Sequence, residues 1–288
     1  KQIQKRKRFI DGLMILLSTG ILLLVTCRID HGLGPLHSKI GGRVYLTGDL
    51  PRHTDEIRVA AALTFPPRNL NELLFSDMLQ FRSGNTITNT SPEWEIYLPQ
   101  GTYEIVGAIW KENNQSWNIS DVIGLYGTVF IENIPSGLPK PVTVLHENHV
   151  IDTIDIHANL ERVDRDAKIS GTITFEGSWP EDTGAVGVGA FIEKPKPNDP
   201  FDYFFKNVSL NYGVPTFTEA YDYTLRVNSS DTLKYIAVLW IDNSYDLNRI
   251  KDIGFYSDPG NPDSPAMVTV AEDSEEKGID ITVDFSQP

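Results

Sequence analysis

The sequence predicts an all-β protein built of two tandem antiparallel β-sandwiches that follow an N-terminal signal segment. Three observations predict this fold. Apolar and polar residues alternate with a period of two, 22 glycines and 18 prolines separate the alternating segments, and the second half repeats motifs of the first in the same order. Such alternation is typical of strands with one face on a core and one in water. The length of 288 residues, 40% of them hydrophobic, suits about two domains.

The N-terminal segment has the features of a targeting sequence. Four cationic residues, Lys5-Arg6-Lys7-Arg8, precede a largely apolar run from Leu13 to Val25. This run is shorter than the ~20 residues that a helix needs to cross a bilayer, and it matches the apolar region of a signal peptide. We therefore expect residues 1–27 to be a signal peptide.

The single cysteine ends this segment. Leu24-Val25-Thr26 stands directly before Cys27, which resembles the lipobox of bacterial lipoproteins, although Thr26 departs from the small residue preferred there. The resemblance implies a lipidated Cys27 that anchors the chain in the cell envelope. Because Arg28 is not the aspartate that signals inner-membrane retention, it also implies the outer membrane. The alternative is an uncleaved membrane anchor with an incidental cysteine.

An internal duplication divides the rest of the chain. The segment Gly42–Gly48 reappears as Gly171–Gly177, and the paired residues that follow keep nearly the same offset. Those pairs include Pro51 with Pro180, Thr54 with Thr183, Trp110 with Trp240, and Ile154-Asp155-Ile156 with Ile279-Asp280-Ile281. Copies of this size suit separate domains rather than solenoid repeats. The sequence predicts a tether over 28–40, repeat 1 over 41–160, a polar linker over 161–168 and repeat 2 over 169–286.

Individual elements follow from the local pattern. Strands are expected over 43–47, 93–98, 151–156 and 279–285, where apolar residues alternate with polar ones. Leu70, Leu73, Leu74 and Met78 recur at helical spacing, which predicts a helix over Asn69–Leu79. The corresponding stretch of repeat 2, Asn198–Tyr212, is aromatic and interrupted by proline, so we expect no matching helix there.

One turn resembles a known fold family. Leu98-Pro99-Gln100-Gly101-Thr102-Tyr103, between two apolar strands, is similar to a hairpin of the prealbumin-like sandwich, which includes transthyretin-like and carboxypeptidase regulatory-like domains. The second repeat lacks this turn at Leu225–Ser230. The hydrolase branch of the transthyretin-like proteins ends in Tyr-Arg-Gly-Ser, whereas this sequence ends at Asp284–Pro288. The resemblance therefore implies a sandwich fold without that activity.

The acidic loop after the second repeated tryptophan is a candidate calcium site. Oxygen-bearing side chains alternate there as a hard cation requires, at Asp242, Ser244, Asp246 and Asn248, with Asp252 further on. Leu247 and Ile253 stand where a calcium loop has glycine and glutamate. The alternative is a turn in which these side chains bond to their own backbone.

Aromatic residues of repeat 2 are candidates for ligand binding. They are Trp179, Phe201, Tyr203 and Tyr212. The alternative for the stretch from Phe201 to Tyr212 is that it caps the core of the second sandwich, because monomers rarely expose large apolar patches. Trp110 and Trp240 end equivalent apolar strands, which predicts that they pack in the cores.

Composition limits the function. A net charge of −14 argues against a nucleic-acid partner, and one cysteine excludes a disulfide framework. We expect a non-catalytic envelope lipoprotein that acts as a binding or assembly module for protein or glycan, with calcium as a candidate structural ion. The alternatives are a glycan-binding accessory lipoprotein of polysaccharide uptake and a hydrolase with an unrecognised site.

Overall fold

The computed structural model describes residues 38–65, 67, 72–131, 134–197 and 199–286. The fold is all-β, as predicted, and the described helices are α2 (Pro200–Phe205) and three 3₁₀ turns, η2 (Ile119–Asp121), η3 (Leu160–Val163) and η4 (Leu247–Arg249). None of the described helices is long and apolar enough to span a membrane. The predicted signal peptide with Cys27, and nearly all of the predicted tether, lie outside the described residues.

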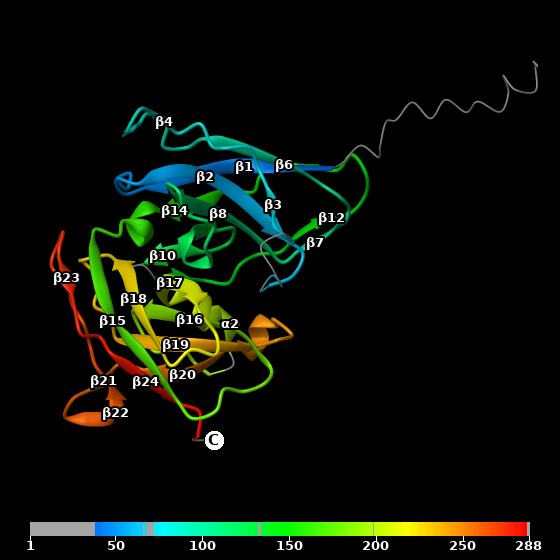
Figure 1. Ribbon diagram of the computed structural model, residues 1–288. Coiled ribbons are helices and arrows are strands. Elements are labelled where there is room, and N and C mark those ends of the chain that lie inside the picture. The colour runs from blue at the N-terminus through cyan, green and yellow to red at the C-terminus, as the bar shows by residue number, and fades with distance from the viewer. Residues whose placement is uncertain (1–37, 66, 68–71, 132–133, 198, 287–288) are drawn as a thin grey trace, which may run out of the picture. The chain divides into compact units, whose positions relative to one another are not determined.

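The first sheet of repeat 1 is centred on β1 (Ser38–Thr47) (Figure 1). This strand pairs antiparallel with β6 (Glu93–Leu98) and parallel with β13 (Val150–Ile151) and β14 (Ile156–Asn159). Buried and exposed residues alternate along the whole of β6, as the sequence predicts. The parallel pairs mean that the sheet is mixed rather than wholly antiparallel.

The second sheet of repeat 1 is antiparallel and packs against the first. Its strand order is β3 (Leu74–Phe75), β2 (Thr54–Ala62), β8 (Ile105–Glu112) and β9 (Val122–Leu125). Shorter pairs complete the repeat: β4 (Arg82–Ser83) with β5 (Thr86–Ile87), β7 (Gly101–Tyr103) with β12 (Val142–Val144), and β10 (Val129–Ile131) with β11 (Ile134–Ser136).

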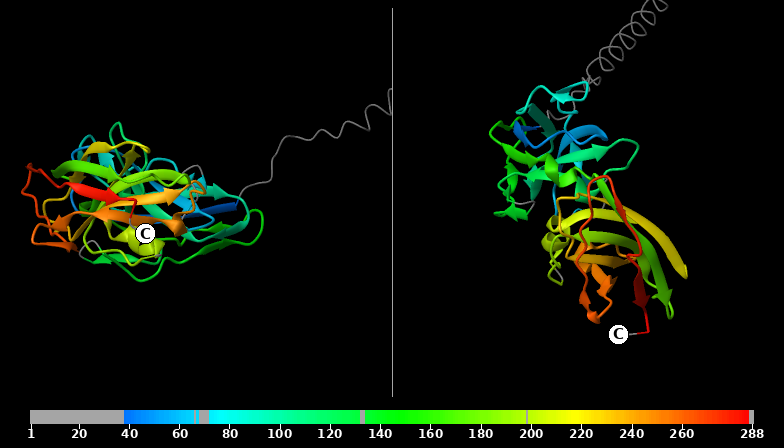
Figure 2. Two further views of the ribbon diagram at one scale, coloured as in Figure 1. Left: turned by 60° about the horizontal axis from the view of Figure 1, so that its bottom comes forward. Right: turned by 90° about the vertical axis from the view of Figure 1, so that its left-hand side faces the viewer.

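Repeat 2 has the same two-sheet plan. In one sheet β15 (Ala167–Glu176) pairs antiparallel with β18 (Ala220–Val227), and parallel with β23 (Glu275–Glu276) and β24 (Ile281–Asp284). Figure 2 shows β15 and β18 running side by side as long curved strands. The other sheet has the order β17 (Asn207–Val214), β16 (Thr183–Phe191), β19 (Tyr235–Asp242) and β20 (Lys251–Phe255), and β21 (Ser257–Asp258) pairs with β22 (Asn261–Pro265).

The two repeats also agree in their close backbone contacts. A Cβ atom on Gly42 would lie 2.2 Å from the carbonyl oxygen of Ile154, and one on Gly171 would lie 2.1 Å from that of Ile279. A side chain cannot be accommodated at that distance from a backbone atom, so each repeat needs glycine where its first strand passes the segment just before its last strand. The two repeats therefore share this packing contact as well as their sequence motifs.

Each repeat has its own hydrophobic core. The first core runs from Ile40 to Val163 along the chain and the second from Ala167 to Val283. Trp110 belongs to the first core and Trp240 to the second, which confirms the prediction that both tryptophans are packing residues.

The prediction of a helix over Asn69–Leu79 is wrong for the residues of this range that the structure describes, 72–79. Residues 74–75 form β3, and the segment then follows the edge of β2: the Ser76 amide donates to the Val59 carbonyl over 2.8 Å, and the Leu79 amide to that of Ile57 over 2.9 Å. These bonds outweigh the helical spacing of the leucines. The α-helix of the described residues, α2, lies instead in repeat 2, where we expected no matching helix, and the Asp199 side chain caps its first turn before Pro200.

Candidate functional site

The predicted linker is a packed junction of the two repeats. It includes most of η3 and the first residues of β15. The Arg162 side chain is only 3% exposed, and its Nε donates to the Val122 carbonyl over 3.2 Å. Burial, together with the nearby Arg165, lowers the pKa of Arg162 to about 10. This segment is therefore part of the folded structure rather than an exposed connection.

Arg165 bonds to both repeats. Its Nη1 lies 2.7 Å from Oδ1 of Asp121, and its Nη2 donates to the Ser120 carbonyl over 3.0 Å, both in repeat 1. Its Nε donates to the carbonyl of Val208 in repeat 2 over 3.0 Å. The Arg165 and Asp121 side chains are 9% and 4% exposed. Burial raises the pKa of Asp121, and Arg165 opposes that shift.

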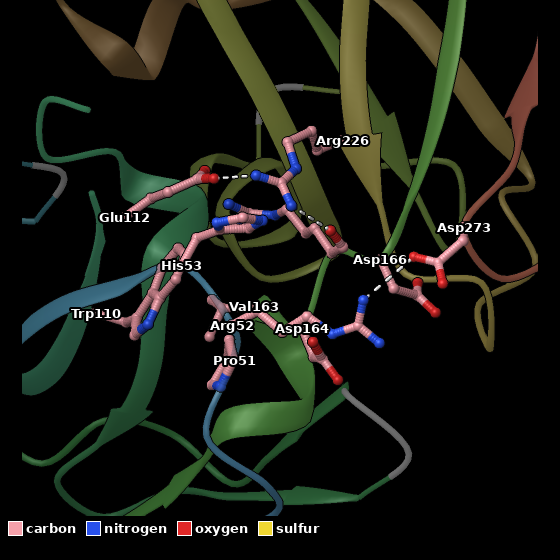
Figure 3. A pocket seen from close by; sticks show the side chains of 11 residues that line it. Pro51, Arg52, His53, Trp110, Glu112, Val163, Asp164, Asp166, Arg226 and Asp273 are labelled. Carbon is pink, nitrogen blue, oxygen red and sulfur yellow. Dashed lines mark hydrogen bonds and ion pairs between the residues drawn. The ribbon is translucent and has the colours of Figure 1, made fainter. Parts of the chain in front are cut away.

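A charged cleft lies beside this ion pair (Figure 3). Arg226 bonds to the Glu112 carboxylate and, through Nη2, to the Arg165 carbonyl over 2.9 Å. At the mouth, Arg52 Nη1 lies 3.5 Å from Asp273 Oδ1. The cleft has a volume of about 60 Å³. Glu112 belongs to repeat 1 and Arg226 to repeat 2, so their ion pair joins the two repeats across this cleft.

The aromatic residues of α2 lie at the same junction. Phe204 and Phe205 are buried in a cluster with Leu125 of repeat 1. Phe201 is 37% exposed, and its ring centroid lies 4.5 Å from that of Phe65. Most of this stretch therefore packs between the repeats.

Tyr203 points to the other side of α2, into repeat 2. Its hydroxyl donates to Oδ1 of Asp252 over 2.9 Å, and the Tyr235 hydroxyl donates to the same carboxylate. Burial alone would raise the pKa of Asp252, but the two tyrosine hydrogen bonds lower it overall. Asp252 thus accepts hydrogen bonds from two buried tyrosines. It makes these bonds apart from the acidic loop, with which it was grouped as a candidate calcium ligand.

The acidic loop forms a turn. Oδ1 of Asp242 accepts the Ser244 amide over 3.1 Å, and its Oδ2 lies 2.7 Å from Arg249 Nη1. Asp246 caps η4 and accepts the Asn248 amide over 3.0 Å. Hydrogen bonds from Ser244 and Asn248 lower the pKa values of Asp242 and Asp246. Among the described residues, no group of three or more His, Cys, Asp or Glu is placed to hold a metal, and calcium stays a prediction.

Tyr212 lies in a groove on repeat 2. Tyr212 of β17 and Tyr245, after β19, are 47% and 52% exposed. They line a groove of about 140 Å³, here called the tyrosine groove, with apolar side chains that include Leu210, Ile241 and Ile250. Tyr245 has a φ of 55°, which is rare for a bulky residue, and its hydroxyl donates to the Gly184 carbonyl over 3.1 Å. Tyr245 is not among the predicted ligand-binding residues, because it stands inside the loop interpreted as a calcium site.

Trp179 is separate from the other three predicted ligand-binding residues. Its ring packs on Phe175 and Phe285, with centroids 4.5 and 4.8 Å away, and on Phe217 at 5.6 Å. Its Nε1 donates to the Thr218 carbonyl over 3.1 Å. The four residues therefore occupy three places: Trp179 in this cluster, Phe201 and Tyr203 on α2, and Tyr212 in the tyrosine groove.

No model of a protein family matches the chain, and no curated protein matches it. The solved structures that overlap with it weakly include the following three. A leucine-rich repeat protein from Bacteroides thetaiotaomicron shares 9% identity at a TM-score of 0.33, over 86% of this chain and 26% of its own length. This chain therefore spans about a quarter of that protein. A candidate cell adhesion protein from Bacteroides fragilis shares 11% identity at a TM-score of 0.25, over 87% of this chain and 94% of its own length. A DUF3823 family protein from Parabacteroides merdae shares 10% identity at a TM-score of 0.21, over 76% of this chain and 99% of its own length.

Proposed function

We propose that this chain is a non-catalytic binding module of the bacterial cell envelope, with a prealbumin-like sandwich type and a lipidated Cys27, and that it binds a glycan. The observation that carries the proposal is the tyrosine groove, which two half-exposed tyrosines line together with apolar side chains. The lipobox resemblance at Leu24–Cys27 supports the envelope location.

The chemistry of the groove suits a sugar ring. A pyranose has an apolar face of C–H groups and an edge of hydroxyls. Tyrosine likewise combines an apolar ring with a polar tip, and Tyr212 is presented by strand β17. The volume of about 140 Å³ suits one ring of a longer chain rather than a whole oligosaccharide. A folded partner would need a larger surface.

The carboxylates of this region support binding without catalysis. A general acid or base works best with a pKa near the operating pH. The hydroxyl hydrogen bonds that reach Asp242 and Asp252 lower the pKa values of both groups instead. Both carboxylates are also occupied, Asp242 by Arg249 and Asp252 by two tyrosines.

Calorimetric titration with a panel of neutral oligosaccharides tests the glycan proposal. At least one should bind, and Tyr212→Ala and Tyr245→Ala should each weaken it about tenfold, as loss of an aromatic contact does at a binding hot spot. Tyr97→Ala is the matched control, because Tyr97 is 59% exposed and lies on β6 of repeat 1. A panel without any binder, or binding that both groove variants leave unchanged, would overturn the proposal.

The anchor is tested separately with Cys27→Ser in a bacterial host. Wild-type protein should incorporate labelled palmitate and sediment with membranes, whereas the variant should lose the label. Acyl chains contribute about 0.8 kcal/mol per buried methylene, so their loss should release the processed protein. An unlabelled wild-type protein that stays in the membrane fraction would indicate the uncleaved anchor instead.

A further inference from the structure

One side of the tyrosine groove is formed by an edge strand, β17, that the junction of the repeats supports. β17 is the outermost strand of its sheet, and alternate carbonyls of an edge strand point away from the sheet. Two carbonyls of β17 accept hydrogen bonds from junction side chains. Arg165 Nε donates to Val208 over 3.0 Å, and Asn118 Nδ2 of repeat 1 donates to Leu210 over 2.7 Å. Leu210 lines the groove, so a residue of repeat 1 holds part of a site in repeat 2.

The strand needs this support because its regular pairing with β16 is interrupted at the groove. Asn211 of β17 pairs with Val188 of β16. The next pair joins Val214 to Val186, so two residues of β17, Tyr212 among them, face a single residue of β16. Such a β-bulge disrupts the ladder locally and redirects side chains. The position of Tyr212 is therefore fixed less firmly by β16 than that of its neighbours, and the bond from Asn118 is made only two residues before it.

Asn118 is itself fixed at the start of η2. Its Oδ1 accepts both the amide and the hydroxyl of Ser120, each over 3.0 Å. Because the oxygen is bound within repeat 1, the orientation of the side chain amide is set, and its nitrogen points across the junction to Leu210.

We propose that Asn118 is a positioning residue for the tyrosine groove. Its bond to Leu210 fixes the part of β17 that carries Tyr212, so that binding in repeat 2 depends on repeat 1. Contact residues of a binding site must be held within about 0.5 Å of the productive geometry, and Asn118 supplies that support without lining the groove. This inference rests on the glycan proposed for the groove and adds a residue that acts on it through β17.

Asn118→Asp tests the proposal with little change of shape. The carboxylate keeps an oxygen for the Ser120 amide but has no proton to donate to the Leu210 carbonyl. A neutral oligosaccharide that binds the wild type should bind this variant about tenfold more weakly in calorimetric titration, because a hydrogen bond is lost and its acceptor is left unpaired. Asn118→Ala removes the donor without adding a charge and should weaken binding in the same way.

Asn228 offers a matched control, because it makes the same set of bonds at the same junction. Its Oδ1 accepts the amide and the hydroxyl of Ser230 over 2.8 and 2.7 Å, and its Nδ2 donates to the Glu161 carbonyl over 2.9 Å. Glu161 belongs to η3 and not to β17. Asn228→Asp therefore makes the same chemical change without altering the support of the groove, and it should leave the affinity for the oligosaccharide unchanged.

The ring resonances of Tyr212 give a second readout, which needs no glycan. They are identified in protein with ¹³C-labelled tyrosine by their absence in Tyr212→Phe. Both Asn118 variants should move them, because the ring changes place when β17 loses its support, and Asn228→Asp should not.

Two results would overturn the proposal. One is a set of Tyr212 resonances that neither Asn118 variant moves, and the other is an Asn228→Asp variant that weakens glycan binding as much as Asn118→Asp does. A wild-type protein that binds no oligosaccharide, but whose Tyr212 resonances respond to the Asn118 variants alone, would refute the glycan proposal and support the positioning of Tyr212 by Asn118.

Discussion

The indole N–H of Trp110 donates to the hydroxyl of Thr54 over 2.8 Å, and Trp240 makes the same bond to Thr183 over 2.9 Å. In each repeat the threonine hydroxyl in turn donates, over 2.8 Å, to the carbonyl of the proline three residues earlier. A turn, a strand start and a core tryptophan are thus joined by the same chain of bonds twice. Both repeats keep the side-chain chemistry of the duplication as well as its backbone.

The threonine hydroxyls should contribute measurably to stability. Thr54→Val keeps the shape of the side chain but leaves the Trp110 indole N–H buried without an acceptor. We expect the free energy of unfolding to fall by about 1–3 kcal/mol, as measured by denaturant titration. Thr183→Val should act similarly in repeat 2. Thr54→Ser, which retains the hydroxyl, should cost less, and equal losses for Val and Ser would contradict the proposed role of the bond.

The duplicated glycines should not tolerate alanine. Gly42→Ala and Gly171→Ala place a methyl group about 2 Å from the backbone carbonyl oxygen of Ile154 or Ile279, which cannot rotate away as the end of a side chain could. Overpacking of this kind costs about 1–3 kcal/mol or more, so the melting temperature should drop sharply in both variants. Gly260→Ala is the control, because its Cβ would meet only the Asp258 side chain, 3.2 Å away. Similar losses in all three would disprove the packing argument.

The sequence predicted those features of the fold that depend on local pattern and on repetition. Alternation along Glu93–Leu98 and the recurrence of Gly42 at Gly171 were sufficient for strands and for two sandwiches. The helix predicted at Asn69–Leu79 failed because the spacing of its leucines cannot show that the edge of β2 has free backbone groups nearby. Helical propensity is a weak preference that tertiary hydrogen bonds override.

The Arg165–Asp121 ion pair should be essential to the junction. Asp121→Ala leaves a buried guanidinium without its counter-charge, which costs about 3–5 kcal/mol. We expect a lower melting temperature and faster proteolytic cleavage within 161–168. Asp273→Ala, which removes the partner of Arg52 from a pair that is 74% and 64% exposed, should change stability by under about 1 kcal/mol. If the two variants behave alike, Arg165 does not hold the repeats together.

The candidate sites were harder to predict than the fold for a physical reason. The charged residues of Glu161–Lys168 indicate a polar linker, since arginine is rarely buried without a partner. The partner of Arg165 is 44 positions earlier in the chain, and no local pattern links them. The bond from Asn118 to the Leu210 carbonyl is invisible for the same reason, because the two residues are 92 positions apart in the sequence.

Acid should weaken repeat 2 through Asp252. The bonds from Tyr203 and Tyr235 hold its folded-state pKa below the ordinary value, so the carboxylate stabilises the fold above about pH 4 and this contribution is lost as pH falls further. Asp252→Asn should be less stable than wild type at neutral pH, and the difference should shrink in acid. Denaturant titrations from about pH 7 to pH 2 measure this. A difference that stays constant over the range would exclude the titration of Asp252 as its cause.

Calcium should leave the thermal stability of the chain unchanged. The loop that alternates oxygen side chains uses them internally: Asp242 is bonded to Ser244 and Arg249, and Asp246 caps the following 3₁₀ turn. An ion would have to displace Arg249 and break that cap. Calorimetry with excess calcium and then with chelator decides the matter, since a ligand at a hundredfold excess over its Kd adds about 2.7 kcal/mol to a folded state that it binds. A rise in melting temperature that Asp242→Ala and Asp246→Ala both abolish would make the loop an ion site after all.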